Sequence, residues 1–221
     1  MRLASGFFAI LTACLAAVLA AQAPTTAPEL ASALQRRYDA VRDFSADFEH
    51  RYRGGVLRRE TVERGTVLVK KPGKMRWEYT APEPKLFVSN GTRISFYVPA
   101  DKQVTVSAMP DESAAPTPAL FLAGRGSLTR DFDVSLTDPP EGLTEGARAL
   151  KLVPRTPQSD YDWLVLVVDP ATLALRGLVA MDAQGGTSTF TFTNLEEDVR
   201  PPDSRFEFEV PRGVDVITAP H

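Results

Sequence analysis

The sequence predicts a mainly β protein with a helical lid, built as a curved antiparallel half-open β-barrel of about 10–11 strands whose helices cover an apolar cavity. Three observations support this prediction. Apolar and polar residues alternate with a period of two over most of the chain, one amphipathic helix precedes this alternation, and a short proline-bounded helical insertion interrupts it. A single antiparallel sheet of this size curls, and helices must cover one of its faces.

Residues 1–23 have the features of a secretory signal peptide. Arg2 is the only charge before Glu29, and an apolar run from Phe7 to Ala21 is followed by small residues. The run is short for a membrane span. Ala21-Gln22-Ala23 fits the small-x-small cleavage pattern, and cleavage after Ala20 or Ala21 fits equally well. We therefore expect a periplasmic protein whose residues 24–221 form one domain.

An alternative at the N-terminus is a lipobox at Leu11-Thr12-Ala13-Cys14, which would make Cys14 an acylated membrane anchor. The apolar run continues to Ala21, where a tether should turn polar, so the sequence favours the signal peptide. Its cleavage removes Arg2 and the only cysteine, which leaves 24 of the 25 basic residues against 28 acidic ones, a net charge of −4. A disulfide is then excluded, and the lack of a basic cluster argues against nucleic acid as a partner.

The first helix is predicted over residues 28–43. Thr26-Ala27-Pro28-Glu29 is a capping box, and Leu30, Leu34, Tyr38 and Val41 recur at helical spacing. Strands follow, with hairpin turns at Gly54-Gly55 and Asn90-Gly91. The first series covers residues 44–48, 61–70, 75–79, 86–88, 94–97 and 103–107.

The lid is predicted at about residues 116–131, where the alternation breaks. Pro116-Thr117-Pro118 introduces a short apolar helix, Ala119–Ala123, which Gly124 ends, and Ser127 caps a second helical piece. The second strand series follows, with turns at Asp169-Pro170 and Gly185-Gly186. It covers residues 132–136, 149–153, 161–168, 173–181 and 187–195.

The residues offer little chemistry. The two histidines, His50 and His221, are far apart, and no histidine or cysteine pair has the spacing of a metal site. The segment from Gly124 to Ser127 lacks the third glycine of a phosphate loop and a histidine that would activate the serine. We therefore expect no catalytic residues, no metal and no cofactor, and a protein that is not an enzyme.

The apolar residues instead suggest a cavity. Periodicity alone favours an ordinary sheet–helix core, but a curved sheet covered by small helices that proline and glycine connect can open as a lid. The candidate cavity residues are Phe44, Phe48, Val67, Val69, Trp77, Tyr79, Leu86, Val88, Phe96, Leu120 and Phe121. From the residues alone, Lys71 is the polar end of a strand.

Two blocks resemble the LolA family. The first runs from Gly65 to Val106 and includes Lys70-Lys71-Pro72, Arg76-Trp77-Glu78-Tyr79, Val88-Ser89-Asn90-Gly91 and Phe96-Tyr97-Val98-Pro99; the second holds Phe206-Glu207-Phe208 and Pro211–Val216. The resemblance implies an incomplete barrel with a lid over a hydrophobic cavity. It implies a monomeric periplasmic carrier that takes triacylated lipoproteins from an inner-membrane ABC lipoprotein-releasing complex to an outer-membrane lipoprotein receptor.

One departure from the family pattern concerns the lid. The residue before the proline is often an arginine that holds the lid closed, and here it is Lys71, a point charge in place of a planar fork. Our hypothesis is that Lys71 acts as the latch and reaches carbonyl oxygens at the end of the lid helix. Two alternatives share this type of half-barrel: a lipoprotein-anchored receptor and a stress-sensing regulator.

Overall fold

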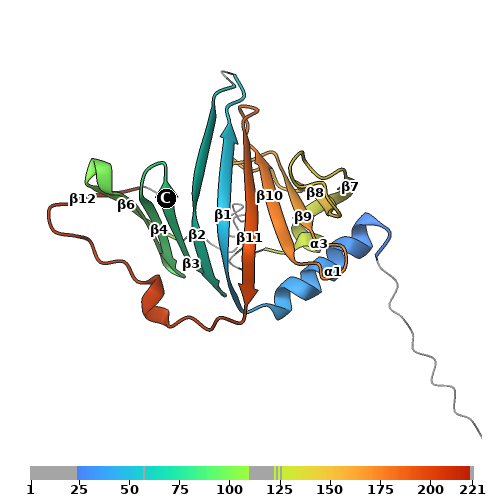
Figure 1. Ribbon diagram of the computed structural model, residues 1–221, viewed down its shortest axis with the longest axis horizontal. Helices are drawn as coiled ribbons and strands as arrows, with labels where there is room; N and C mark the ends of the chain where they lie inside the picture. Colours follow the sequence, from blue (N-terminus) through green and yellow to red (C-terminus); the bar gives the residue numbers. More distant parts are fainter. Residues whose placement is uncertain (1–23, 57, 110–121, 123, 125, 220–221) are drawn as a thin grey trace, which may run out of the picture.

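The protein is described by a computed structural model, which places residues 24–56, 58–109, 122, 124 and 126–219. Its described strands form one curved, open sheet of 12 strands in the order β12-β6-β5-β4-β3-β2-β1-β11-β10-β9-β8-β7 (Figure 1). The described helices are α1 (Ala27–Ala40), α3 (Leu128–Asp131) and two 3-10 turns, η1 (Pro99–Asp101) and η2 (Asp203–Phe206). The mainly β, half-open architecture is thereby confirmed.

Six strands precede the predicted lid and six follow it. The first six are β1 (Asp43–Arg53), β2 (Glu60–Lys70), β3 (Lys74–Ala81), β4 (Lys85–Asn90), β5 (Arg93–Val98) and β6 (Gln103–Ala108). The others are β7 (Phe132–Thr137), β8 (Arg148–Pro154), β9 (Trp163–Val168), β10 (Leu175–Met181), β11 (Thr187–Glu197) and β12 (Asp215–Thr218).

Strand β12 corrects two expectations. The sheet has 12 strands, not 10–11, and it is not wholly antiparallel, because β12 pairs in parallel with β6 at its edge. All four residues of β12 are exposed. A strand with no buried face shows no alternation between apolar and polar residues, so the sequence carried no signal for it.

Helix α1 begins where its capping box predicts. Thr26 Oγ1 accepts a hydrogen bond from the Glu29 N–H at 3.4 Å, and Glu29 Oε2 accepts one from the Thr26 N–H at 3.0 Å. The predicted end at residue 43 is wrong, since the helix ends at Ala40. Asp43 is the first residue of β1 and pairs with Lys70. Its backbone hydrogen bonds are therefore made within the sheet and are not available to extend the helix.

The inner face of the sheet, defined by Phe48 and Trp77, packs against α1 and α3. Leu30 and Leu34 of α1 and Leu128 of α3 belong to the same buried cluster as these two aromatic residues. The strands come close together at Gly65, beside a bulge in the β2–β3 pairing. A Cβ atom there would lie 1.9 Å from the Glu78 carbonyl oxygen, which explains the glycine.

The outer face of β3 and β4 is covered by the segment after β11. Its 3-10 turn η2 contacts both strands, and Phe206 is fully buried. Phe208 lies with its ring centroid 5.5 Å from that of Tyr97 on β5. This part of the sheet is therefore buried on both faces.

Candidate functional site

The inner face holds an apolar cavity of about 280 Å³. Its apolar lining comes from β3, β4, β10, β11 and the lid residue Leu122, and consists of Trp77, Tyr79, Phe87, Leu122, Leu178, Ala180 and Phe190. Aromatic rings form much of the wall. The Trp77 ring lies edge-on to those of Phe48 and Phe190, with centroid distances of 5.1 and 5.5 Å.

A second, smaller cavity of about 40 Å³ lies between α1 and strands β9 and β10. Leu34 and Val41 line it from the α1 side, and Phe44 and Leu166 from the sheet. Leu122 lines both cavities and is 1% exposed. Displacement of this one lid residue would therefore open both spaces.

Most predicted cavity residues lie on the inner face. Phe44, Phe48, Val67, Val69 and Trp77 are all buried there, with Trp77 and Tyr79 lining the larger cavity and Phe44 the smaller one. Phe96 pairs with Phe87 and so shares its face, but its side chain is 37% exposed. Leu120 and Phe121 lie outside the described residues.

The assignment of Leu86 and Val88 to the cavity is wrong. Leu86 pairs with Glu78 and Val88 with Arg76, on the face opposite to Trp77. The inward residue is Phe87, which pairs with Trp77 and lines the cavity. Three consecutive apolar residues show no alternation, so only the strand register decides which of them points inward. The sequence reasoning also missed Leu178 and Ala180 on β10, another almost continuously apolar strand.

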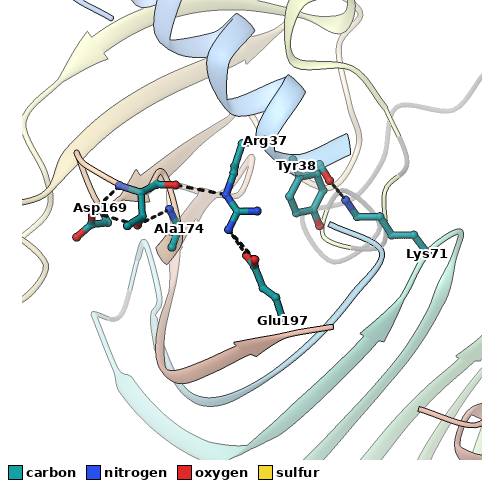
Figure 2. Close-up of polar contacts among 7 residues, drawn as sticks. Arg37, Tyr38, Lys71, Asp169, Ala174 and Glu197 are labelled. Atoms are coloured by element: carbon teal, nitrogen blue, oxygen red, sulfur yellow. Dashed lines mark hydrogen bonds and ion pairs between the residues drawn. The ribbon is translucent and has the colours of Figure 1, made fainter. Parts of the chain in front are cut away.

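Lys71 lies beside α1, and its contacts differ from the hypothesis. Among the described residues its Nζ donates to the backbone carbonyl of Tyr38, at the end of α1 and not of the lid helix (Figure 2). Nζ also lies 3.2 Å from the centroid of the Tyr38 ring. The Tyr38 hydroxyl in turn donates to the Leu122 carbonyl oxygen. Tyr38 therefore links Lys71 to the lid.

The lid has two further contacts near this point. A Cβ on Gly124, which has a φ of +81°, would lie 2.7 Å from Cδ of Lys71, so the lysine stem packs on the lid backbone. Gln35 Oε1 accepts a hydrogen bond from the Leu128 N–H at 2.7 Å. The lid thus rests on α1, which sequence reasoning missed because Tyr38 and Gln35 looked like ordinary helix positions.

The end of α1 is in turn fixed to the sheet. One Nη of Arg37 contacts both carboxylate oxygens of Glu197 on β11, at 2.7 and 2.6 Å, and Arg37 Nε donates to the Thr172 carbonyl oxygen at 3.3 Å (Figure 2). Burial lowers the pKa of Lys71 to about 8, against the opposing influence of Asp39 and Glu197. Lys71 therefore carries its charge at neutral pH and loses it under mildly alkaline conditions.

In the part of the chain that the structure describes, no group of three or more histidine, cysteine or acidic side chains could hold a metal ion. No helix in that part is long and apolar enough to cross a membrane.

A curved open sheet whose inner face holds an apolar cavity, closed by Leu122, defines a class of proteins that bind apolar groups. The model of the family described as outer membrane lipoprotein carrier protein LolA matches residues 39–209. The chain belongs to the LolA family.

Two relatives that are similar in sequence carry the name outer-membrane lipoprotein carrier protein. An outer-membrane lipoprotein carrier protein of Chromohalobacter salexigens is 32% identical over 206 residues, which cover 93% of each chain. One of Methylococcus capsulatus is 31% identical over 198 residues and 90% of each chain. An uncharacterised conserved protein of Thermus thermophilus shares the fold, with a TM-score of 0.51 and 15% identity over 86% of this chain and 99% of that one.

Proposed function

We propose that this protein is a periplasmic carrier, which binds the acyl chains of lipoproteins released from the inner membrane and delivers them to the outer membrane. The observation that carries this proposal is the apolar cavity on the inner face of the sheet. The lid residue Leu122 lines this cavity and also the smaller cavity beside α1. Membership of the LolA family supplies the cargo class. The protein acts by binding and release and not as an enzyme. Its partners are an inner-membrane ABC lipoprotein-releasing complex and an outer-membrane receptor, and it works as a monomer.

The size of the cavity supports a carrier that opens and closes. Drug-sized ligands occupy pockets of roughly 300–1,000 Å³. The larger cavity, at about 280 Å³, is too small for three acyl chains unless the lid moves. Complete burial of three chains, at about 0.8 kcal/mol per methylene, would also exceed the ceiling of roughly 18–21 kcal/mol for reversible binding. Partial burial by a movable lid allows release.

Filling the cavity tests this function. Ala180 lines the larger cavity, so we expect Ala180→Phe to weaken binding of a fluorescent triacylated lipopeptide at least tenfold. The new ring occupies space the acyl chains need, and a side chain that grows into a cavity strains the core less than one that grows into packed atoms. Thr189→Phe is the matched control, because Thr189 lies on the adjacent strand and faces outward.

Thermal unfolding of both variants separates lost binding from lost folding. If Ala180→Phe is folded and binds the lipopeptide as tightly as the parent, the acyl chains do not enter this cavity and the carrier proposal fails. Leu178→Phe, at a second lining position, repeats the test should Ala180→Phe be unstable.

Processing tests the proposed compartment. We expect the mature protein to begin between Ala21 and Pro24, because the apolar run extends past Cys14. Mass spectrometry of the intact protein from a periplasmic extract measures this start. A diacylglyceryl group on Cys14 in the membrane fraction would instead identify an anchored receptor.

A further inference from the structure

The inner face changes from apolar to polar along its strands. Near α1, the inward residues of β1 are Phe44, Ala46 and Phe48, and their partners on β2 and β11 include Val69, Val67 and Phe192. Toward the β1–β2 turn the inward pairs become His50 with Glu63 and Tyr52 with Thr61. An amphiphile bound on this face would therefore place its apolar end toward α1 and its polar end toward the turn.

A compact cluster of His50, Glu63 and Lys85 occupies the polar part. His50 Nδ1 lies 3.1 Å from Glu63 Oε2, and Lys85 pairs with the other oxygen of the same carboxylate. The His50 and Glu63 side chains are each only 16% exposed. The imidazole lies flat on the ring of Phe190, at a centroid distance of 4.2 Å, and Phe190 lines the larger cavity.

Within the described residues, two nitrogen atoms beside Phe190 are buried without a hydrogen-bond partner: Nε2 of His50 and Nε1 of Trp77. Because a carboxylate only accepts, the Glu63 contact places the proton of a neutral imidazole on Nδ1 and leaves Nε2 as an acceptor. Burial lowers the pKa of His50 and so favours this neutral form, while the bond to Glu63 opposes it. Nε1 of Trp77 is a donor.

The two rings that carry this unsatisfied acceptor and donor thus both contact the ring of Phe190. Trp77 is 4% exposed and lines the cavity, with its ring 5.5 Å from that of Phe190. Buried polar groups without partners are costly, so a ligand that satisfies both gains more than its apolar burial alone provides. An amide offers one N–H and one carbonyl oxygen, the complementary pair.

We propose that His50 and Trp77 form a binding site for the amide that joins an acyl chain to the N-terminal cysteine of a triacylated lipoprotein. The proposal rests on the carrier function proposed above. The amide N–H donates to His50 Nε2, and the carbonyl accepts from Trp77 Nε1. The acyl chains then extend toward α1, and the polypeptide leaves at the end of the sheet formed by the β1–β2 and β10–β11 turns. Lipoproteins with a free N-terminal amine lack this amide and bring a charge into the site.

The test uses two substitutions that keep an aromatic ring, and two probes. His50→Phe keeps the stacking on Phe190, and Trp77→Phe keeps a ring, while each removes one hydrogen bond. We expect each to weaken binding of a synthetic triacylated lipopeptide about tenfold. His50→Phe changes a residue that does not line the cavity, so it should leave binding of an apolar fluorescent polyene within twofold of the parent. Arg51→Met, on the outer face of β1, is the control.

The outcomes separate this site from the carrier function. Equal losses of lipopeptide and polyene binding in His50→Phe would show that His50 only shapes the cavity. Lipopeptide binding at the parent level in either variant would show that the amide lies elsewhere. Either result overturns the amide site. Binding of the lipopeptide by the parent protein would still support the carrier function. Failure of the parent to bind the lipopeptide overturns both. A photoreactive group on the third residue of the lipopeptide should label residues 52–61 or 182–188, and labelling of α1 would contradict the orientation.

Discussion

Replacing Lys71 with leucine should leave lipoprotein uptake intact and slow transfer to acceptor membranes at least tenfold. The Lys71 ammonium holds Tyr38, whose hydroxyl holds the Leu122 carbonyl of the lid. A hydrogen bond to a charged group contributes about 1.5–3 kcal/mol. We expect the Lys71–Tyr38 bond to form only when the lid is closed, which would favour the closed over the open state roughly ten- to a hundredfold. In the proposed carrier, closure expels the acyl chains, so the loss of this bond should trap the cargo. Loading each variant and following transfer to receptor-bearing membranes measures the effect.

Three companion variants test the path of this latch. Lys71→Arg should restore transfer, because its guanidinium keeps a donor at the same place. Tyr38→Phe removes only the hydroxyl that contacts the lid and should also slow transfer. The double variant Tyr38→Phe with Lys71→Leu should be no slower than the slower single variant, since both act through one chain of contacts. Transfer by Lys71→Leu at the parent rate would show that Lys71 is only the solvated end of a strand.

The pKa of Lys71 predicts the pH dependence of the latch. Burial lowers it to about 8 in the folded protein, from 10.5. Between these values the unfolded chain binds the extra proton, so this group's contribution to stability rises with pH and is lost as pH falls through about 8. The charge-assisted bond to Tyr38 changes in the opposite direction and weakens above about pH 8. Transfer by the parent should therefore slow from pH 7 to pH 9, and transfer by Lys71→Arg should not.

Truncating Phe206 should produce a large loss of stability and leave the cavity intact. Phe206 is fully buried over the outer face of β3 and β4, so Phe206→Ala should lower the free energy of unfolding by about 3–5 kcal/mol. The same segment is held by Asp203, which contacts Lys70 at 2.6 Å and Lys74 at 2.8 Å. Urea-induced unfolding measures the change. Lipopeptide affinity of the folded variant should stay unchanged, because the inner face is untouched.

Val210→Ala is the matched control for this truncation. Val210 follows in the same segment but is 44% exposed, so its truncation should change stability by no more than about 0.5 kcal/mol. A loss below about 1 kcal/mol for Phe206→Ala would mean that the segment after β11 is not part of the core. The expected result would show that Phe206-Glu207-Phe208, in the second sequence block that resembles the LolA family, stabilises the fold by packing on the sheet.

Features that depend on neighbours in the chain were determined by the sequence itself. The capping box at Thr26 starts α1, and the Asn90-Gly91 turn joins β4 to β5, because both are built from hydrogen bonds within a few residues. The alternation in β1 and β3 likewise placed Phe48 and Trp77 on one face. Period-two burial needs only the local strand geometry.

Features that depend on strand register were decided only by the tertiary structure. The pairing of β3 with β4 determines that Phe87 faces inward and Val88 outward within one apolar run. Strand pairing also places Glu63 beside His50 and Lys85. Packing of α1 gave Lys71 a partner in Tyr38 where the sequence suggested the lid helix. The physical reason is that a one-residue shift in pairing exchanges the two faces of a strand, and pairing is set by contacts between distant segments, which no local pattern records.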